Sequence, residues 1–171
     1  MNTLQANKLW FLILILSFNI GLIGFGVTPS EGKTKTGSGP ALLQPGQPAA
    51  YSDLKVTLLS LKRASNFTKN PKKGREYAVL RFRVKNMGKE EASALIISDL
   101  QWKDSASGMR EGYERTTGVK LNNPKKYDLA PGAQGEFEEV YMFPLNLSQA
   151  EFHLMKGYNP KEIARWLMPI K

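Results

Sequence analysis

The chain of 171 residues contains no cysteine. This absence excludes disulfide bridges, thiolate metal sites, cysteine nucleophiles and a lipid-modified cysteine behind a signal segment. The stability of a folded domain must therefore come from packing alone. A domain of about a hundred residues or more is large enough to bury a hydrophobic core.

Histidine and catalytic motifs are also scarce. His153 is the single histidine, too little for an ordinary zinc or copper site, and no nucleophile-elbow motif accompanies it. Its surroundings predict a half-exposed strand histidine. The adjacent acids Glu90-Glu91 and Glu138-Glu139 would diverge in a strand, because successive side chains point to opposite faces. We therefore expect a non-enzymatic protein without a cofactor or metal.

Charged residues are nearly absent from the N-terminal region, where Lys8 is the only one before Glu31. The apolar segment 9–27 is 19 residues long, and a helix of that length, at about 1.5 Å per residue, just crosses a membrane. Residues 1–27 are predicted to be either a membrane anchor helix or a cleaved signal peptide. Lys8 favours a cytoplasmic N-terminus, so the remainder is predicted to be extracytoplasmic.

Residues 28–48 are dominated by Gly, Pro, Ser, Thr and Lys. Such a composition buries little apolar surface and predicts a disordered, flexible linker. The folded domain is accordingly expected over residues 49–171.

Within this domain, apolar residues recur mostly in steps of two. In segment 77–86 the even-numbered residues from Ala78 to Val84 are apolar, while Arg81, Arg83 and Lys85 point the other way. That alternation predicts a strand with one buried face and one solvated face. Segment 54–61 is apolar on both sides and predicts a strand in the interior of a sheet.

Shorter strands are predicted over residues 95–97 and 100–102, and a longer one over residues 137–143. The alternation in the last is disturbed near Glu138 and Glu139, which we attribute to a β-bulge. Residues 160–168 fit a short C-terminal helix or a final strand. Turn residues at 86–88, 105–108 and 130–132 separate these elements. The pattern predicts an all-β sandwich.

The turn and packing motifs also resemble a known family. They read VKNMGKE at 84–90, LQWKDS at 100–105, LAPG at 129–132 and MFP at 142–144, with Gly108 and Tyr113 between them. The chain resembles the exported bacterial family called domain of unknown function 4352 over roughly residues 47–157. The resemblance implies an immunoglobulin-like β-sandwich, similar in fold to mycobacterial immunoprotective extracellular antigens. It carries no active site, and the lipid-bearing cysteine of some members is missing here.

Basic residues are concentrated in one segment. Residues 62–85 carry nine basic side chains against the single acid Glu76, a local charge of +8. The whole chain beyond residue 27 carries 23 basic and 15 acidic residues, also a charge of +8, so the part outside residues 62–85 is neutral. The sequence predicts a polyanion-binding face made of Lys62, Arg63, Lys69, Lys72, Lys73, Arg75, Arg81, Arg83 and Lys85. The plainer interpretation is an ordinary solvated surface.

These features predict a non-enzymatic, extracytoplasmic interaction module of the bacterial cell envelope. Its expected partner is an anionic cell-wall polymer, an acidic lipid or another envelope component, with the membrane contacted through residues 9–27. Nucleic acid is disfavoured, because the predicted compartment does not contain it and Tyr77 is the only aromatic residue placed to stack on a base. The alternatives are a solute-binding or enzymatic site built from loops, and a purely structural spacer.

Overall fold

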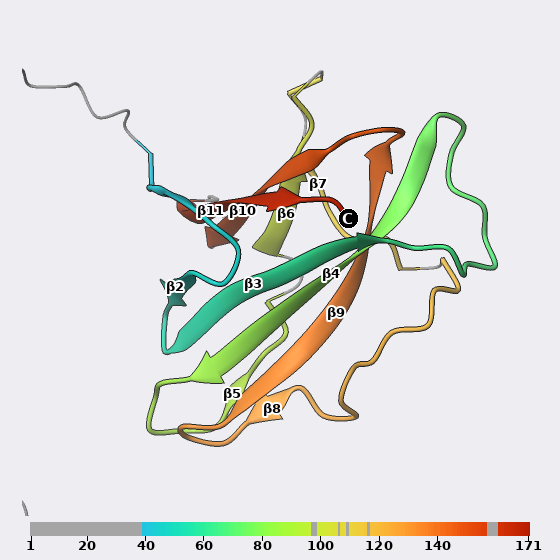
Figure 1. Cartoon of the computed structure of the whole chain (residues 1–171). Coiled ribbons are helices and arrows are strands. Elements are labelled where there is room, and N and C mark those ends of the chain that lie inside the picture. Colours follow the sequence, from blue (N-terminus) through green and yellow to red (C-terminus); the bar gives the residue numbers. More distant parts are fainter. Residues whose placement is uncertain (1–38, 97–98, 106, 109, 116, 157–160) are drawn as a thin grey trace, which may run out of the picture. The chain divides into compact units, whose positions relative to one another are not determined.

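The computed structural model describes residues 39–171 except 97–98, 106, 109, 116 and 157–160 (Figure 1). The apolar segment 9–27 and residues 28–38 lie outside this part of the chain. The described residues form a four-stranded sheet, a five-stranded sheet and a small two-stranded sheet. Among them, no helix is long and apolar enough to cross a membrane.

The four-stranded sheet is antiparallel, in the order β2-β3-β4-β9. Its strands are β2 (Pro48–Tyr51), β3 (Leu54–Arg63), β4 (Arg75–Asn86) and β9 (Gln134–Pro144). Figure 1 shows β3, β4 and β9 as long neighbouring strands. The predicted strands 54–61, 77–86 and 137–143 are thereby confirmed, and β3 is an interior strand as expected.

The five-stranded sheet has the order β1-β11-β10-β6-β7, and the two-stranded sheet pairs β5 with β8. These strands are β1 (Leu42–Leu43), β5 (Ala92–Ser93), β6 (Leu100–Lys103), β7 (Arg110–Glu111), β8 (Asp128–Leu129), β10 (Gln149–Lys156) and β11 (Lys161–Pro169). Of the two possibilities for residues 160–168, the strand is the one observed from residue 161 onward, paired along its length with β10. The predicted strand 100–102 is confirmed as β6.

A single apolar core lies between the two larger sheets, so the predicted all-β sandwich is confirmed. The predicted inward residues of β4, including Leu80 and Phe82, are fully buried. The opposite layer contributes large side chains from β6, β10 and β11, namely Trp102, Phe152 and Trp166, all with at most 1% of their surface exposed. Each such side chain stabilises the fold by about 1.5–3 kcal/mol relative to exposure.

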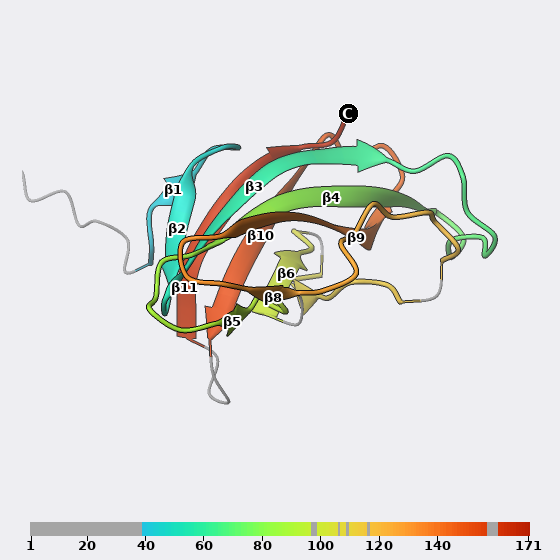
Figure 2. The same cartoon turned by 90° about the horizontal axis from the view of Figure 1, so that it is seen from below.

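The folded part begins before residue 49, so the predicted linker 28–48 is too long. β1 pairs with β11 and β2 with β3, and Figure 2 shows both short strands at one edge of the sandwich. The Trp166 indole also donates a hydrogen bond to the carbonyl of Gln47 over 2.9 Å. The composition of residues 28–48 did not predict these strands, because two short strands can be held by backbone hydrogen bonds and need few apolar side chains.

The predicted strand at residues 95–97 is wrong for Leu95 and Ile96, while Ile97 lies outside the described residues. The backbone turns there, since Ile96 N donates to Ala94 O over 2.7 Å. Ile96 is buried while Leu95 is 58% exposed. An apolar run alone therefore did not identify a paired strand.

The predicted bulge at Glu138 and Glu139 is also wrong, because the register of β9 against β4 is unbroken. The alternation of β9 is disturbed because both of its faces are covered. Phe137 and Tyr141 enter the main core, while Val140 and Met142 join a second apolar cluster on the other face. Register shifts occur instead in β3, between Leu58 and Ser60, and in β10, between Leu154 and Met155.

The shift in β3 changes which side chains face outward. Val56 and Leu58 point into the core, and an unbroken alternation would send Ser60 and Lys62 there as well. The extra residue Leu59 resets the alternation, so Leu61 is buried opposite Leu80 and Lys62 lies on the outer face opposite Val79.

Two of the predicted turns are joined by Asn86, which is fully buried. Its amide donates to the carbonyls of Glu90 and Leu129, over 2.7 and 2.8 Å, and its Oδ1 accepts from Gly88 N over 2.8 Å. The two turns at residues 86–88 and 130–132 therefore lie next to each other in space, which the sequence did not predict. A Cβ at Gly88 would approach Asp53 Cβ to 2.9 Å, which explains the need for glycine.

Candidate functional site

The predicted basic residues are distributed over the whole length of β4 and the loop before it. Arg81, Arg83 and Lys85 do lie on the outer face of the sheet, as predicted, since the residues between them are buried. At about 3.4 Å per residue, however, Arg75 and Lys85 are roughly 30 Å apart along the strand. That separation exceeds the screening length of about 8 Å at physiological salt, so the nine residues do not act as one patch.

The outward arginines Arg81 and Arg83 of β4 share one carboxylate of the neighbouring strand, which leaves the group with one net positive charge. Antiparallel pairing places Arg83 opposite Glu136 and Arg81 opposite Glu138. Glu136 binds both arginines: its Oε1 lies 2.5 Å from Arg83 Nη2, and its Oε2 contacts Arg81. Hydrogen bonds from Arg83 and then Arg81 hold the pKa of Glu136 below its usual value, despite a smaller opposing effect of desolvation.

Arg63 and Arg75 are likewise engaged in holding the fold together. Arg63 Nε lies 3.0 Å from Glu76 Oε2, and its guanidinium also donates to the carbonyls of Leu147 and Ile170. Arg75 Nη1 donates to both carboxylate oxygens of Glu111 over 2.7 Å. These arginines link β3 and β4 to segments of the opposite layer, which is a structural role.

The predicted lysines differ from the arginines in their lack of carboxylate partners among the described residues. Among the described residues, none of the five makes an ion pair with a carboxylate: Lys62, Lys69, Lys72, Lys73 and Lys85. All but Lys85 are exposed. The uncompensated positive charge of the segment therefore lies mainly on its lysines.

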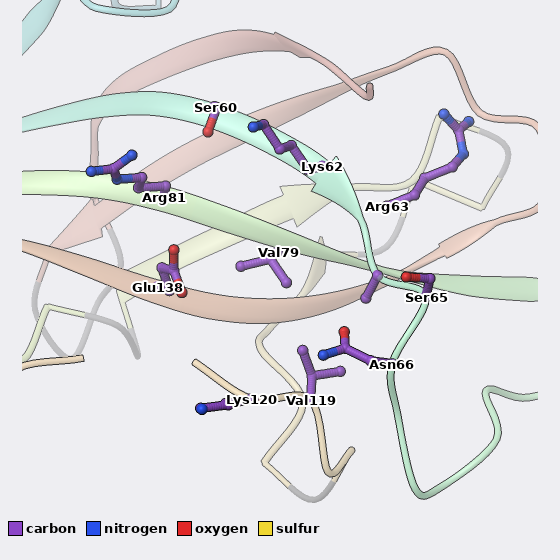
Figure 3. Close-up of a pocket in the computed structure, with 11 residues that line it drawn as sticks. Ser60, Lys62, Arg63, Ser65, Asn66, Val79, Arg81, Val119, Lys120 and Glu138 are labelled. Carbon is purple, nitrogen blue, oxygen red and sulfur yellow. The ribbon is translucent and has the colours of Figure 1, made fainter. Parts of the chain in front are cut away.

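One of these lysines, Lys62, lies at a hollow of about 230 Å³ on the outer face of the four-stranded sheet. Figure 3 shows Ser60 and Lys62 on β3, Arg81 on β4 and Glu138 on β9, with Lys120 across from them. The remaining lining residues are Arg63, Ala64, Ser65, Asn66, Val79 and Val119. The hollow thus combines cations with hydroxyl and amide groups, which suits an anionic oxygen ligand.

Lys120 was not among the predicted residues. It belongs to the connection between β7 and β8, far from residues 62–85 in the sequence, and it is exposed. No local pattern around Lys120 indicates a role, because it comes to line the same hollow as Lys62 only when its segment folds over β9. The feature of the sequence that could have indicated its position is the adjacent apolar residue Val119. Val119 packs against the apolar cluster of Tyr77, Val140 and Met142 and so fixes this segment on the sheet.

Two contacts hold the segment 117–123 over the sheet. Thr68 N and Lys69 N both donate to Thr117 O, over 3.0 and 3.1 Å. At the other end, the Asn123 side chain forms two hydrogen bonds with the Glu138 backbone: Oδ1 accepts from Glu138 N over 2.6 Å, and Nδ2 donates to Glu138 O over 2.9 Å. The side chain thus pairs with β9 as a neighbouring strand would. The hollow is therefore bounded by loops with defined positions.

Gly118 makes the first of these contacts possible. Its φ of +70° is accessible mainly to glycine, and a Cβ there would lie 1.8 Å from Thr68 Oγ1. Phe67 then packs edge-on against Tyr77, with 5.5 Å between the ring centroids.

The charges around the hollow are only partly balanced. Arg81 is bound to Glu136, and the Glu138 carboxylate accepts a hydrogen bond from Asn122 N over 2.8 Å. Lys62 and Lys120 have no carboxylate partner among the described residues. Two lysines facing one glutamate leave an excess of positive charge.

His153 is buried, with 3% of its surface exposed, so the predicted half-exposed histidine is wrong. Its Nδ1 lies 3.1 Å from Glu162 Oε2 and its Nε2 3.6 Å from Glu151 Oε1. Neighbouring strands cover it because Gln101 and Arg165 lie directly beside it in the sheet. Within the described ranges, no group of three or more His, Cys, Asp or Glu residues could hold a metal ion.

Comparison with known proteins identifies the fold. The secreted protein MPT63 of Mycobacterium tuberculosis matches with 11% identity and a TM-score of 0.56, covering 75% of this chain and 98% of MPT63. The yjhA protein of Bacillus subtilis matches with 10% identity and a TM-score of 0.53, covering 76% of this chain and all of the other. At these identities the likeness concerns the fold alone, and it confirms the predicted similarity to a secreted mycobacterial β-sandwich.

No family model matches the chain, so membership of domain of unknown function 4352 stays a prediction. No curated protein sequence matches it either.

Proposed function

We propose that this protein is a non-enzymatic, extracytoplasmic, immunoglobulin-like module that binds a phosphate-bearing component of the bacterial envelope. The binding site is the hollow between Lys62 and Lys120, and the ligand is an anionic cell-wall polymer or the headgroup of an acidic lipid. The observation that carries the proposal is the pair of exposed lysines, brought together from distant segments without a carboxylate partner among the described residues.

The extracytoplasmic location is supported by two independent features. Segment 9–27 has the length and apolarity of an export or anchoring segment, with Lys8 on its cytoplasmic side. The folded part shares its architecture with a secreted mycobacterial protein. Protease added to intact protoplasts should therefore digest the domain, and protection of the domain would contradict the proposed location.

The division between arginines and lysines supports the choice of site. An arginine already bound to a carboxylate must break that ion pair before it can bind a ligand, whereas Lys62 and Lys120 have no such pair to break. Ser60, Ser65 and Asn66 add neutral hydrogen-bonding groups beside them. Lys69, Lys72 and Lys73 belong to the adjacent loop and are expected to contribute less, because exposed charges act over about 8 Å at physiological salt.

The test compares two double charge reversals in the full-length chain, held in a neutral detergent. Lys62→Glu with Lys120→Glu alters the hollow. Lys55→Glu with Lys85→Glu makes the same change of charge at another site of the same sheet face, where these two residues are cross-strand neighbours. The probes are purified anionic wall polymer and a water-soluble, short-chain phosphatidylglycerol.

We expect the first variant to lose roughly tenfold or more in affinity and the second to lose much less, since exposed charges act over about 8 Å. Binding should also weaken as salt is added. The probe that binds more tightly identifies the source of the phosphate. Equal losses in the two variants, or no binding of either probe, would contradict the proposed site.

A further inference from the structure

A second cavity, of about 450 Å³, lies where segment 113–121 crosses β9. Glu114 N donates to Val140 O over 2.7 Å, which holds the crossing in place. The lining is mixed: Leu95, Tyr113, Leu121 and Tyr127 supply apolar and aromatic surface, and Glu114, Arg115, Thr117 and Glu139 supply polar groups. A cavity of this size and lining matches the pockets that hold small organic ligands.

The cavity contains a buried carboxylate without a partner. Glu139 lies on the core-facing side of β9 opposite Leu80, and 8% of its surface is exposed. Its side chain makes no hydrogen bond or ion pair with any described residue. Desolvation raises its pKa from 4.5 to about 7. A buried acid of this kind destabilises the fold unless a ligand or solvent compensates it.

The other charged groups at the cavity do not compensate the negative charge of Glu139. Arg115 is the one basic residue among the lining residues, and its guanidinium lies over the Tyr113 ring at 5.4 Å from the centroid. Its Nε donates to the Tyr113 hydroxyl over 2.9 Å. Glu114 adds a second carboxylate to the lining. Arg115 is thus held at Tyr113, and among the described residues it forms no ion pair with Glu114 or Glu139.

We propose that this cavity binds a small organic cation, an ammonium group on an apolar body, with Glu139 as its charge partner and the rings of Tyr113 and Tyr127 beside it. Ammonium groups are attracted to the faces of tyrosine rings as well as to carboxylates. Tyr127 is held for this role by stacking on Phe137, with 5.4 Å between the ring centroids. The apolar walls accommodate the body of the ligand.

Other ligand classes fit the cavity less well. A metal ion would need several oxygen or nitrogen ligands, and the described residues offer no such group of three. An uncharged alcohol or sugar would leave the carboxylate without a counter-charge. An anion would be repelled by Glu114 and Glu139.

The inference is independent of the proposed polyanion site. The two sites call for ligands of opposite charge, and of the residues that line them only Val119 is common to both. Lys62→Glu with Lys120→Glu should leave amine binding intact, and Glu139→Gln should leave polyanion binding intact. Failure of one proposal is therefore distinguishable from failure of the other.

The test is a titration of the full-length chain, in neutral detergent, with 2-phenylethylammonium and with the uncharged isostere 2-phenylethanol, followed by ligand-observed NMR. We expect saturable binding of the ammonium and roughly tenfold weaker binding of the alcohol. Glu139→Gln should weaken ammonium binding by a similar factor. Glu138→Gln is the matched control, because the neighbouring side chain faces the outer hollow instead.

Binding of the ammonium should also tighten as the pH rises through about 7, because Glu139 must ionise to act as its partner. The other titratable groups near Glu139 are Glu114, Tyr113, Tyr127 and Arg115, which line the cavity, and Tyr141, two residues along β9 on the same face. Equal binding of the alcohol, unchanged affinity in Glu139→Gln, or no binding of the ammonium would each overturn the proposal.

Discussion

Replacing Glu139 with Gln is expected to stabilise the unliganded protein at alkaline pH. The carboxylate is buried on the core side of β9 without a partner among the described residues, and its pKa is raised by desolvation from 4.5 to about 7. A carboxyl group whose pKa is higher in the folded state binds its proton more tightly there. The folded protein therefore loses stability as the pH rises between these two values, and above them the loss is complete.

The size of the effect follows from the shift. Each pKa unit corresponds to about 1.4 kcal/mol, and solvent at the open cavity screens part of this, so ionising Glu139 costs the folded state roughly 1–3 kcal/mol at pH above 7. Glutamine has nearly the same shape and no charge, and it removes this cost. Glu139→Gln should then be more stable than the wild type by up to about 3 kcal/mol near pH 8, and nearly equal to it near pH 4.

Urea denaturation followed by tryptophan fluorescence at both pH values measures the difference. Comparing the two proteins at each pH cancels the titration of all other groups. Glu138→Gln serves as the control, because Glu138 is only half-buried and lines the outer hollow. A difference in stability that is the same at both pH values, or that is larger in acid, would refute the reasoning.

Three further predictions concern the framework of the sites. Asn86→Ala should destabilise the protein by about 2–4 kcal/mol in urea denaturation, because it leaves the carbonyls of Glu90 and Leu129 without this donor. A loss of stability below about 1 kcal/mol would contradict the role of Asn86 in connecting the two turns. Gly118→Ala should detach the loop 64–74 and increase its proteolysis, since the added Cβ would overlap Thr68, and an unchanged cleavage pattern would argue against that contact. Glu136→Gln should destabilise the protein at neutral pH and remove part of its acid sensitivity. The lowered pKa of Glu136 means that its contribution is complete above the ordinary value of 4.5 and is lost as acid titrates it. Denaturation midpoints at neutral and acid pH test this, and parallel acid profiles for the two proteins would contradict it.

The candidate site could be predicted in part. The sequence identified Lys62 and the outward arginines of β4, because clustering of charge and a period of two are local properties. It did not indicate that Arg81 and Arg83 would share the carboxylate of Glu136, since that depends on the register of β9 against β4. It also missed Glu139 as a buried acid. Glu138 and Glu139 point to opposite faces of β9, as expected for adjacent residues of a strand. The burial of Glu139 could not be predicted, because distant segments of the chain cover both faces of β9.

The sequence by itself determined the all-β architecture and the buried face of β4, because alternation along one strand depends only on the geometry of an extended backbone. It likewise determined the turn at Asn86, whose side chain binds groups close to it in the chain as well as Leu129. Only the tertiary structure decided that Lys62 points outward, because the bulge at Leu59 depends on pairing with β4. The placement of Lys62 and Lys120 at one hollow was decided in the same way, since it requires distant segments to come together in the folded sandwich.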